Sequence, residues 1–456
     1  MPGIYASVGL LLTAGVVTSV NWRRRRQLAE RKRGQRIPSP SETAQRTETV
    51  MRAAGAQTVV TISHLDQVLR SIGAWCAQTG LQLPGLTAAR VADDRIDLLL
   101  TTPSPRCPEG ISLAADDSVW TITASDVDTV IDSVEPTAVA APWPALVTLG
   151  RDGAGAHILI NLEAAATLHI NAEDPADARA IIAAIAMELG MSPWASELNI
   201  TLAGTVCPGL ELALDHPTLT RADDIDNLLA LLEDRAADRR AYMADSSAGQ
   251  KRLDPDLADG WGAEVILTDQ LLTEEQDQRL AAILTALPRV GIAAVTTTQA
   301  QGDWTFTVGG EPRVGHLEPQ DWRITPQLVP QQVYDDTLEL LETSATTDTN
   351  PAPWWDHDTS TGRPLPDPVS ESTPPATITA LPTTLTRQPL SLTGLVGDID
   401  LDEFIRSHPE TDGSEPSEPT DQIDLDTAVP GPDTPIDLPD SGDSPPDPPM
   451  MRILRT

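Results

Sequence analysis

An uncharged run of nineteen residues, followed at once by four arginines, constrains this chain more than any other feature. The run extends from Gly3 to Asn21, and Trp22 and Arg23–Arg26 come directly after it. A helix of nineteen residues is about 28 Å long, which matches the hydrocarbon thickness of a bilayer. We therefore expect residues 1–22 to form a transmembrane helix. A short buried helix of a soluble domain is the alternative.

The position of the arginines also predicts an orientation. Positive charge after the apolar stretch is the reverse of a secretory signal peptide, and Lys and Arg accumulate on the cytoplasmic side. This predicts a single-pass protein of the cell membrane, with the N-terminus outside and the bulk of the chain in the cytoplasm. Residues 23–55 would then form a basic juxtamembrane collar and stalk. Its contacts with anionic lipids would come from Arg23, Arg24, Arg25 and Arg26.

The rest of the chain is acidic. The net charge is −36 over 456 residues, residues 37–344 hold 18 basic and 45 acidic side chains, and residues 345–456 hold 5 and 21. Because phosphate binding needs a basic face, we expect no direct nucleic-acid binding. The three cysteines lie far apart and the seven histidines form no ligand motif, so no metal site or disulfide framework is predicted. No catalytic residue and no cofactor is assigned.

Two folded parts are expected between the stalk and the tail. Residues 56–140 predict a small α+β subdomain, with a helix over Ile62–Gly80 and strands over Ile96–Thr101 and Val119–Thr123. Residues 141–344 alternate strand and helix patterns, which favours an α/β domain with a parallel sheet and helical crossovers. The expected strands are 145–149, 157–162, 166–170, 198–203, 264–267, 291–297 and 304–308, and the expected helices are 177–190, 223–243, 273–287 and 333–341.

Residues 345–456 contain twenty of the forty prolines and few large apolar groups. Such a composition cannot bury enough surface to offset the ordering entropy, so we expect a disordered acidic tail. Within it, Ser391–Ser407 is either a short docking segment or the least polar part of a linker. The paired indoles of Trp354 and Trp355 are typical of a partner anchor.

The order of elements over about residues 145–300 resembles the FtsK-like DNA-pumping P-loop ATPases. In this resemblance Ala166–Ile170 is the first strand and Asn171–Arg179 occupies the phosphate loop. The strand Glu264–Leu267 leads to Asp269 at the metal-binding position. The strand that begins at Gly291 ends at Gln299, where the family has its sensor.

The residues at the phosphate-loop position oppose nucleotide binding. A phosphate loop needs glycines whose backbone N–H groups converge, a lysine, and a Ser or Thr for magnesium. Residues 171–179 contain no glycine and no lysine, and they carry Glu173, Asp174 and Asp177. Gln270 stands where the activating carboxylate would follow. The resemblance therefore implies a degenerate relative that kept the fold and lost the nucleotide.

A second resemblance covers roughly residues 1–345. The segments LVTLGRDGAGAHILINLEAAATLHI, SPWASELNITLAG and PQDWRITPQLVPQQVYDDTLELL are similar to the central region of large actinobacterial membrane regulators. Those proteins carry transmembrane helices, frequently a LysM module, and a C-terminal bacterial transcriptional activator domain. Met451–Thr456 is similar to the opening strand of that domain, as if the chain were cut there.

These observations predict a non-enzymatic, membrane-anchored cytoplasmic regulatory or scaffold protein with an unknown protein partner. The membrane half of a transcriptional regulator is the more specific form of this hypothesis. Two alternatives stay open: a nucleotide-dependent translocase or secretion ATPase, and a DNA-binding transcription regulator truncated at its C-terminus.

Overall fold

The computed structural model describes residues 9–32, 34–55, 62–134, 139–243, 246–297 and 304–352, which all belong to one compact unit. The tail from residue 353 onward, with Trp354, Trp355, Ser391–Ser407 and Met451–Thr456, lies outside the described residues. The helices are α1 (Leu10–Glu30), α2 (Glu42–Gly55), α3 (Ile62–Thr79), α4 (Val127–Asp132), α5 (Leu162–Ala165), α6 (Pro175–Met191), α7 (Leu210–Leu214), α8 (Ile225–Met243), α9 (Ala248–Arg252), α10 (Glu274–Thr285) and α11 (Gln331–Ala345). The strands are β1 (Gln35–Arg36), β2 (Leu86–Val91), β3 (Arg95–Leu100), β4 (Ser112–Leu113), β5 (Val119–Thr123), β6 (Leu146–Arg151), β7 (His157–Asn161), β8 (Thr167–Ala172), β9 (Asn199–Ala203), β10 (Leu219–Ala222), β11 (Glu264–Thr268), β12 (Ile292–Thr296), β13 (Trp304–Gly309), β14 (Val314–Glu318), β15 (Trp322–Pro326) and β16 (Asn350–Pro351).

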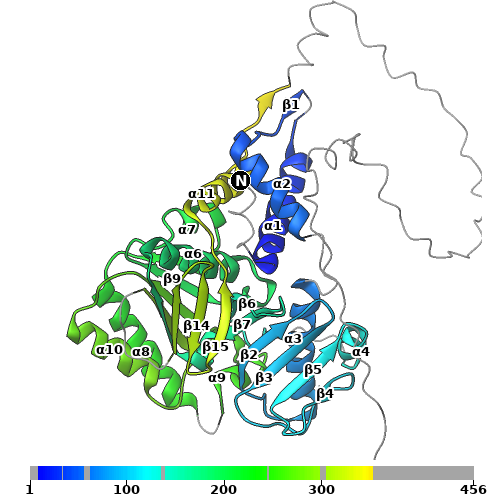
Figure 1. Ribbon diagram of the computed structural model, residues 1–456, viewed down its shortest axis with the longest axis vertical. Coiled ribbons are helices and arrows are strands. Elements are labelled where there is room, and N and C mark those ends of the chain that lie inside the picture. Colours follow the sequence, from blue (N-terminus) through cyan, green and yellow to red (C-terminus); the bar gives the residue numbers. More distant parts are fainter. Residues whose placement is uncertain are drawn as a thin grey trace, which may run out of the picture. The chain divides into compact units, whose positions relative to one another are not determined.

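Fourteen of these strands form one mixed sheet in the order β10-β9-β11-β12-β8-β13-β14-β15-β6-β7-β2-β3-β5-β4 (Figure 1). The pairs from β10 to β13 are parallel, and the pairs from β13 to β4 are antiparallel. The expected parallel sheet is therefore confirmed for one half of a larger sheet.

Both faces of the parallel half are covered by helices. Along β11, Val265 and Leu267 belong to the core that contains α6, while Ile266 between them belongs to the core of α8 and α10. Successive side chains of a strand point to opposite faces, so both faces must be apolar here. This explains why every residue of β11 and β12 is buried.

The prediction of parallel strands is wrong for β6 and β7. They pair antiparallel, with Leu146 opposite Asn161. Only five residues connect these strands, whereas a parallel connection needs a crossover of a dozen residues or more. The strands β2, β10, β14 and β15 were not expected from the sequence at all.

The predicted helix over Ile62–Gly80 is confirmed as α3. Its apolar face is buried through Leu65, Val68, Leu69 and Ile72, and Gly80 follows its last residue with a φ of +67°. The expected strand Val119–Thr123 is β5. Strand β2 pairs with both β3 and β7, so the sheet of residues 86–123 continues into the sheet of the following part.

The N-terminal helix differs from expectation. Among the described residues, no helix is long and apolar enough to cross a membrane. Helix α1 begins at Leu10, continues through all four arginines, and packs against α2, α6 and α11. Leu11, Leu12, Val16 and Val20 are at most 5% exposed. The transmembrane prediction for residues 1–22 is therefore wrong for its described part, because protein rather than lipid covers this apolar face; residues 1–8 lie outside the description.

Candidate functional site

The elements that the sequence assigned to a nucleotide site do come together. Strand β8 pairs with β12, and β12 pairs with β11, all in parallel. Their carboxyl ends therefore lie along one edge of the sheet, which is where open α/β sheets bind ligands. We call this edge the carboxyl edge; it carries the connection from β8 to α6, Asp269 after β11, and Thr297 after β12. Gln299 lies outside the described residues.

The connection from β8 to α6 is too short to be a phosphate loop. Ala172 ends the strand and Pro175 begins the helix, so only Glu173 and Asp174 lie between them. Asp174 Oδ1 accepts a hydrogen bond of 2.8 Å from the backbone N–H of Ala176. The N-terminus of α6 is thus capped by a carboxylate of the chain itself, at the position where a phosphate oxygen would bind in a P-loop protein.

The other acidic groups of residues 171–179, Glu173 in the connection and Asp177 in the first turn of α6, are also hydrogen-bonded. The Glu173 carboxylate accepts from the backbone N–H of Gly310 at 3.3 Å, and the Glu173 N–H donates to Val308 O. Arg313 Nε lies 2.5 Å from Asp177 Oδ2, and this hydrogen bond raises the pKa of the Arg313 guanidinium above its ordinary value. Contacts with the β13–β14 hairpin therefore fix the conformation of this part of residues 171–179, which the sequence assigned to the phosphate loop.

Asp269 holds a neighbouring loop. Its Oδ1 accepts from the backbone N–H of Thr205 at 2.7 Å, and Oδ2 accepts from the Thr205 hydroxyl. Gly204 has a φ of +80°, and a Cβ there would lie 2.3 Å from Asp269 Oδ1. Asp269 consequently ties the end of β11 to the loop after β9.

Arg221 on β10 also binds the loop after β9. This arginine was not identified from the sequence as a site residue. Its guanidinium donates to the carbonyls of Gly204, Val206 and Cys207 and forms an ion pair with Glu211. The two glycines that flank the loop, Gly204 and Gly209, both with positive φ, were the available signal. Burial raises the pKa of the Cys207 thiol to about 12, so this cysteine is a poor nucleophile at neutral pH.

An open groove of about 1010 Å³ lies beside the first turns of α6. Its lining is mostly apolar and includes four prolines: Ala176, Ala180, Ala183, Val206, Pro208, Pro312, Pro326, Leu328, Val329 and Pro330. Arg179 is exposed at the groove and forms no ion pair with any described residue. The groove is a surface on which an extended peptide could lie.

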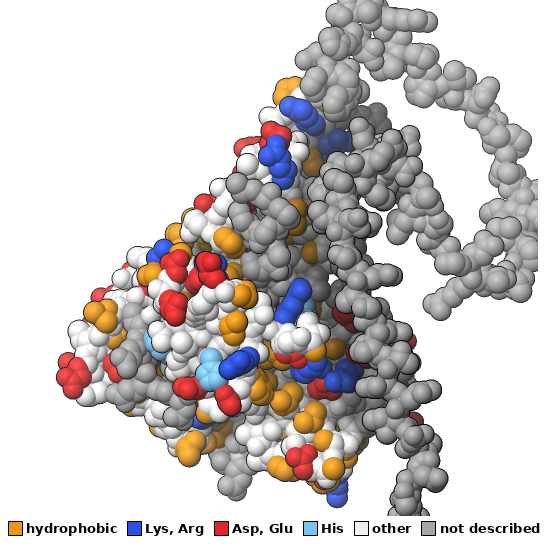
Figure 2. All heavy atoms as spheres, in the orientation of Figure 1, with side chains coloured by type: hydrophobic (Ala, Val, Ile, Leu, Met, Phe, Trp, Pro, Cys, Tyr) orange, Lys and Arg blue, Asp and Glu red, His pale blue; other side chains and the backbone are white. Residues whose placement is uncertain are grey.

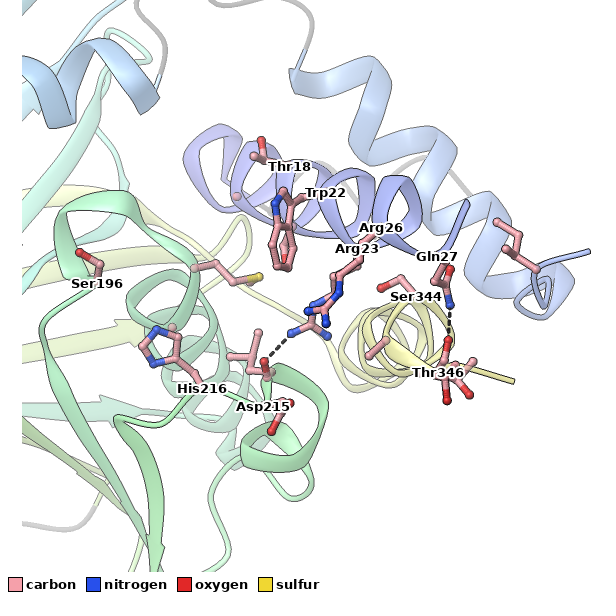
Figure 3. A pocket seen from close by; sticks show the side chains of 18 of the residues that line it. Thr18, Trp22, Arg23, Arg26, Gln27, Ser196, Asp215, His216, Ser344 and Thr346 are labelled. Atoms are coloured by element: carbon pink, nitrogen blue, oxygen red, sulfur yellow. Dashed lines mark hydrogen bonds between the residues drawn. The ribbon is translucent and has the colours of Figure 1, made fainter. Parts of the chain in front are cut away.

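A second cavity, of about 760 Å³, is bounded by α1 and by the C-terminal ends of α6, α7 and α11. Figure 3 shows Trp22 and Arg23 pointing from α1 toward the loop of Asp215 and His216. Arg23 donates to Ala213 O at 2.7 Å, to Leu341 O at 3.2 Å and to Leu214 O. A cation at the C-terminal ends of two helices is favourable, so Arg23 joins α1 to α7 and α11.

Two more side chains of α1 are held in the same way. Gln27 Nε2 donates to Thr343 O and Thr346 O, at 2.8 and 2.7 Å, at the end of α11. Arg24 forms two hydrogen bonds with the Glu48 carboxylate on α2, at 2.5 and 2.8 Å. Of the four arginines that were expected to meet lipid, Arg23 and Arg24 therefore bind protein, whereas Arg25 and Arg26 are exposed.

Among the described residues, no group of three or more His, Cys, Asp or Glu side chains is placed to hold a metal ion. Neither protein-family models nor curated proteins give a match to this sequence, so the resemblance to actinobacterial membrane regulators stays a prediction.

The solved structures that match this chain do so at low sequence identity and low TM-score. One is the pCW3 conjugation coupling protein TcpA, monomer form with ATPγS, at 11% identity over 61% of this chain and 99% of that chain, with a TM-score of 0.32. Another is the cytoplasmic domain of the Thermomonospora curvata Type VII secretion ATPase EccC, at 11% identity over 50% and 35% of the two chains, with a TM-score of 0.31. The cytoplasmic domain of EssC has 11% identity over 49% and 60%, with a TM-score of 0.31.

Proposed function

We propose that this chain is a non-enzymatic regulatory or scaffold protein, built on a sheet of P-loop type that no longer binds a nucleotide. The observation that carries the proposal is the two-residue connection between β8 and α6, in which Asp174 caps the helix where a phosphate would bind. A fold that keeps its sheet without its reactive loop is free to serve as a binding module.

Energetics support this proposal. Opening the cap would cost about 1 kcal/mol. A polyphosphate at this place would also meet the negative charges of Glu173 and Asp174, and each such pair at 4 Å costs up to about 4 kcal/mol at the dielectric of a protein surface. Arg179 and Arg313 lie on the same side, but Arg313 is already paired with Asp177.

A second candidate is a nucleotide-dependent translocase or secretion ATPase. It is favoured by the adjacency of β8, β12 and β11 and by the carboxylate of Asp269 at the end of β11. For this candidate, the β8–α6 connection would have to reopen and Asp269 would have to release Thr205.

The partner of a scaffold would be a protein, and the groove beside α6 offers a surface for it. Direct binding of nucleic acid is not part of the proposal, because residues 37–344 carry a net charge of −27. The more specific role as the membrane half of a transcriptional regulator rests on the sequence resemblance alone.

A titration of the full chain with Mg-ATP and with Mg-ATPγS separates the two candidates. We expect no shift of the unfolding temperature and no heat of binding, for the wild-type chain and for Asp174→Asn, which keeps the cap without the charge. Mg²⁺ alone and AMP are the matched ligand controls. A nucleotide at a hundred times its Kd would stabilise the chain by about 2.7 kcal/mol, and such a shift would establish the second candidate instead.

A further inference from the structure

The exposed positive charge of this acidic chain is concentrated at one end of α1. Residues 22–36 carry eight basic groups and one acidic group, against −27 for residues 37–344. Of those that the structure describes, five are exposed: Arg25, Arg26, Arg31, Lys32 and Arg36. Figure 2 shows basic side chains around β1, the strand that follows α1.

Two large apolar side chains are exposed among these charges. Trp22 is 62% exposed and Leu28 is 49% exposed. Positions 22, 25, 26 and 29 are three or four apart and so lie on one side of the helix; Leu28 lies one turn from Arg25 on the adjoining side, and Lys32 follows the end of α1 at Glu30. We call Trp22, Arg25, Arg26, Leu28 and Lys32 the basic stripe.

The charges of the stripe are available for binding. Within the described residues, Arg25 and Lys32 form no ion pair and no side-chain hydrogen bond. Arg26 pairs only with Glu30, at 3.0 Å on the surface, and both side chains are more than half exposed. An ion pair of this kind contributes little and exchanges readily.

The opposite side of α1 is fixed to the protein. Arg23 binds the helix ends of α7 and α11, Arg24 binds Glu48, and Val16 and Val20 are buried. Docking through the stripe would therefore leave the fold intact. Trp22 and Arg26 lie at the border of the cavity between α1 and the helix ends (Figure 3).

We propose that the basic stripe docks this chain on the surface of an anionic lipid bilayer, with α1 lying on the membrane rather than crossing it. Guanidinium and ammonium groups approach the anionic headgroups while the indole and the leucine enter the interface, which is the pattern of an interfacial helix. A tryptophan and a leucine that are exposed among cations at the end of a helix favour lipid over an acidic protein, because exposed apolar groups gain from the interface.

The acidic body does not prevent this approach. At physiological ionic strength the Debye length is about 8 Å, so distant carboxylates are screened while charges at the contact still act. Binding must therefore weaken as salt is raised. This inference is independent of the nucleotide titration, and its failure would leave the scaffold proposal in place.

Co-sedimentation of the full chain with vesicles tests the proposal. We expect binding to phosphatidylcholine vesicles that contain phosphatidylglycerol, and much less to phosphatidylcholine alone. The variant Arg25→Glu/Arg26→Glu/Lys32→Glu should lower the partition coefficient at least about 100-fold, since each cation near the surface contributes roughly a factor of five. Trp22→Ala should lower it by a smaller factor.

The matched control is Arg95→Glu/Arg106→Glu/Arg323→Glu, which makes the same change of charge at three other exposed arginines. It should bind vesicles like the wild-type chain, and circular dichroism should show both triple variants folded. Absence of binding to phosphatidylglycerol vesicles at low salt would overturn the proposal, as would an equal loss in the two triple variants. If the wild-type chain does not bind vesicles but binds polyglutamate, and the variant of the basic stripe does not bind polyglutamate, then the basic stripe binds an acidic protein instead.

Discussion

At the amino ends of the parallel strands two ion pairs are largely buried, whereas at the carboxyl ends Asp174 and Asp269 are exposed or partly exposed. Arg252, with 2% of its side chain exposed, pairs with Glu163 and donates to Trp261 O at 2.7 Å and to Pro142 O at 3.0 Å. At the other end, Asp174 and Asp269 bind backbone groups of nearby loops.

The two ends therefore differ in what a substitution costs. A buried ion must have all its groups partnered, because an unpaired charge in the interior is strongly destabilising. An exposed carboxylate can exchange a lost partner for water. We infer that the amino ends carry much of the stability of this sheet, and that a phosphate loop can be lost from the carboxyl ends while the sheet persists.

The largest effect is expected for Arg252→Met. The variant leaves Glu163, 12% exposed, without its ion pair, and it removes the donors to two carbonyls. We expect a loss of about 3–5 kcal/mol of the free energy of unfolding, measured by urea denaturation. Arg26→Ala, at an exposed site, should change it by less than about 0.5 kcal/mol. Similar values for both variants would refute the cost assigned to the buried ion pair.

Glu188 on α6 lies at neither end of the parallel strands. It therefore tests whether burial alone determines how much a substitution of a charged side chain changes the free energy of unfolding. It is 1% exposed; Oε1 accepts from the Thr148 N–H and hydroxyl, and Oε2 from Gln327. Desolvation raises the pKa of Glu188 above its ordinary value of 4.5. The folded state therefore binds this proton more tightly than the unfolded state, and the stabilisation, complete below pH 4.5, is lost as pH rises through the raised pKa.

Glu188→Gln should remove this pH dependence. Gln327 Oε1 has no hydrogen-bond partner, so rotation of the Gln327 amide lets it accept from the new amide group. Relative to the wild-type chain, the variant should gain on the order of 1 kcal/mol or more between pH 4 and pH 8. Urea denaturation at several pH values measures this gain. A constant difference across that range would contradict the raised pKa.

A smaller effect is expected at the carboxyl edge. Asp174→Ala removes the cap of α6 and should lower the free energy of unfolding by about 1 kcal/mol. Asp174→Asn should retain most of the stability, because the amide oxygen still accepts from Ala176. Thermal unfolding of the three chains provides the comparison. A loss as large as that of Arg252→Met would show that the carboxyl edge also carries much of the stability of the fold.

Local elements were predictable where a short stretch contains its own signals. Helix α10 begins after Thr273. The Thr273 hydroxyl accepts a hydrogen bond from the backbone N–H of Gln276, and the Gln276 side chain accepts one from the backbone N–H of Thr273. A Thr followed three residues later by a Gln is visible in the sequence. Strands β11 and β12 were predictable because continuous apolar runs are typical of strands covered on both faces. The negative charge of residues 171–179, and hence the expectation that no nucleotide binds there, could also be inferred from the sequence.

The antiparallel half and the loop beside Asp269 were not predictable in this way. Strand β2 pairs with β7 across about seventy residues of sequence, and β15 pairs with β6 across still more. Such pairings depend on which edges remain open after the local elements have formed. The hydrogen bonds from Arg221 to three carbonyls likewise become apparent only when β10 lies next to β9.

By itself, the sequence determined the kind of elements, the order of the parallel strands along the chain, and the place where charge accumulates. Only the tertiary structure decided what residues 10–30 become, because an apolar helix face can be covered by lipid or by protein with the same sequence pattern. Here α2, α6 and α11 cover it, and Arg23 donates to the carbonyls of residues that lie 190 and 318 positions further along the sequence. Burial depends on partners that are distant in sequence, so no local pattern could distinguish these outcomes.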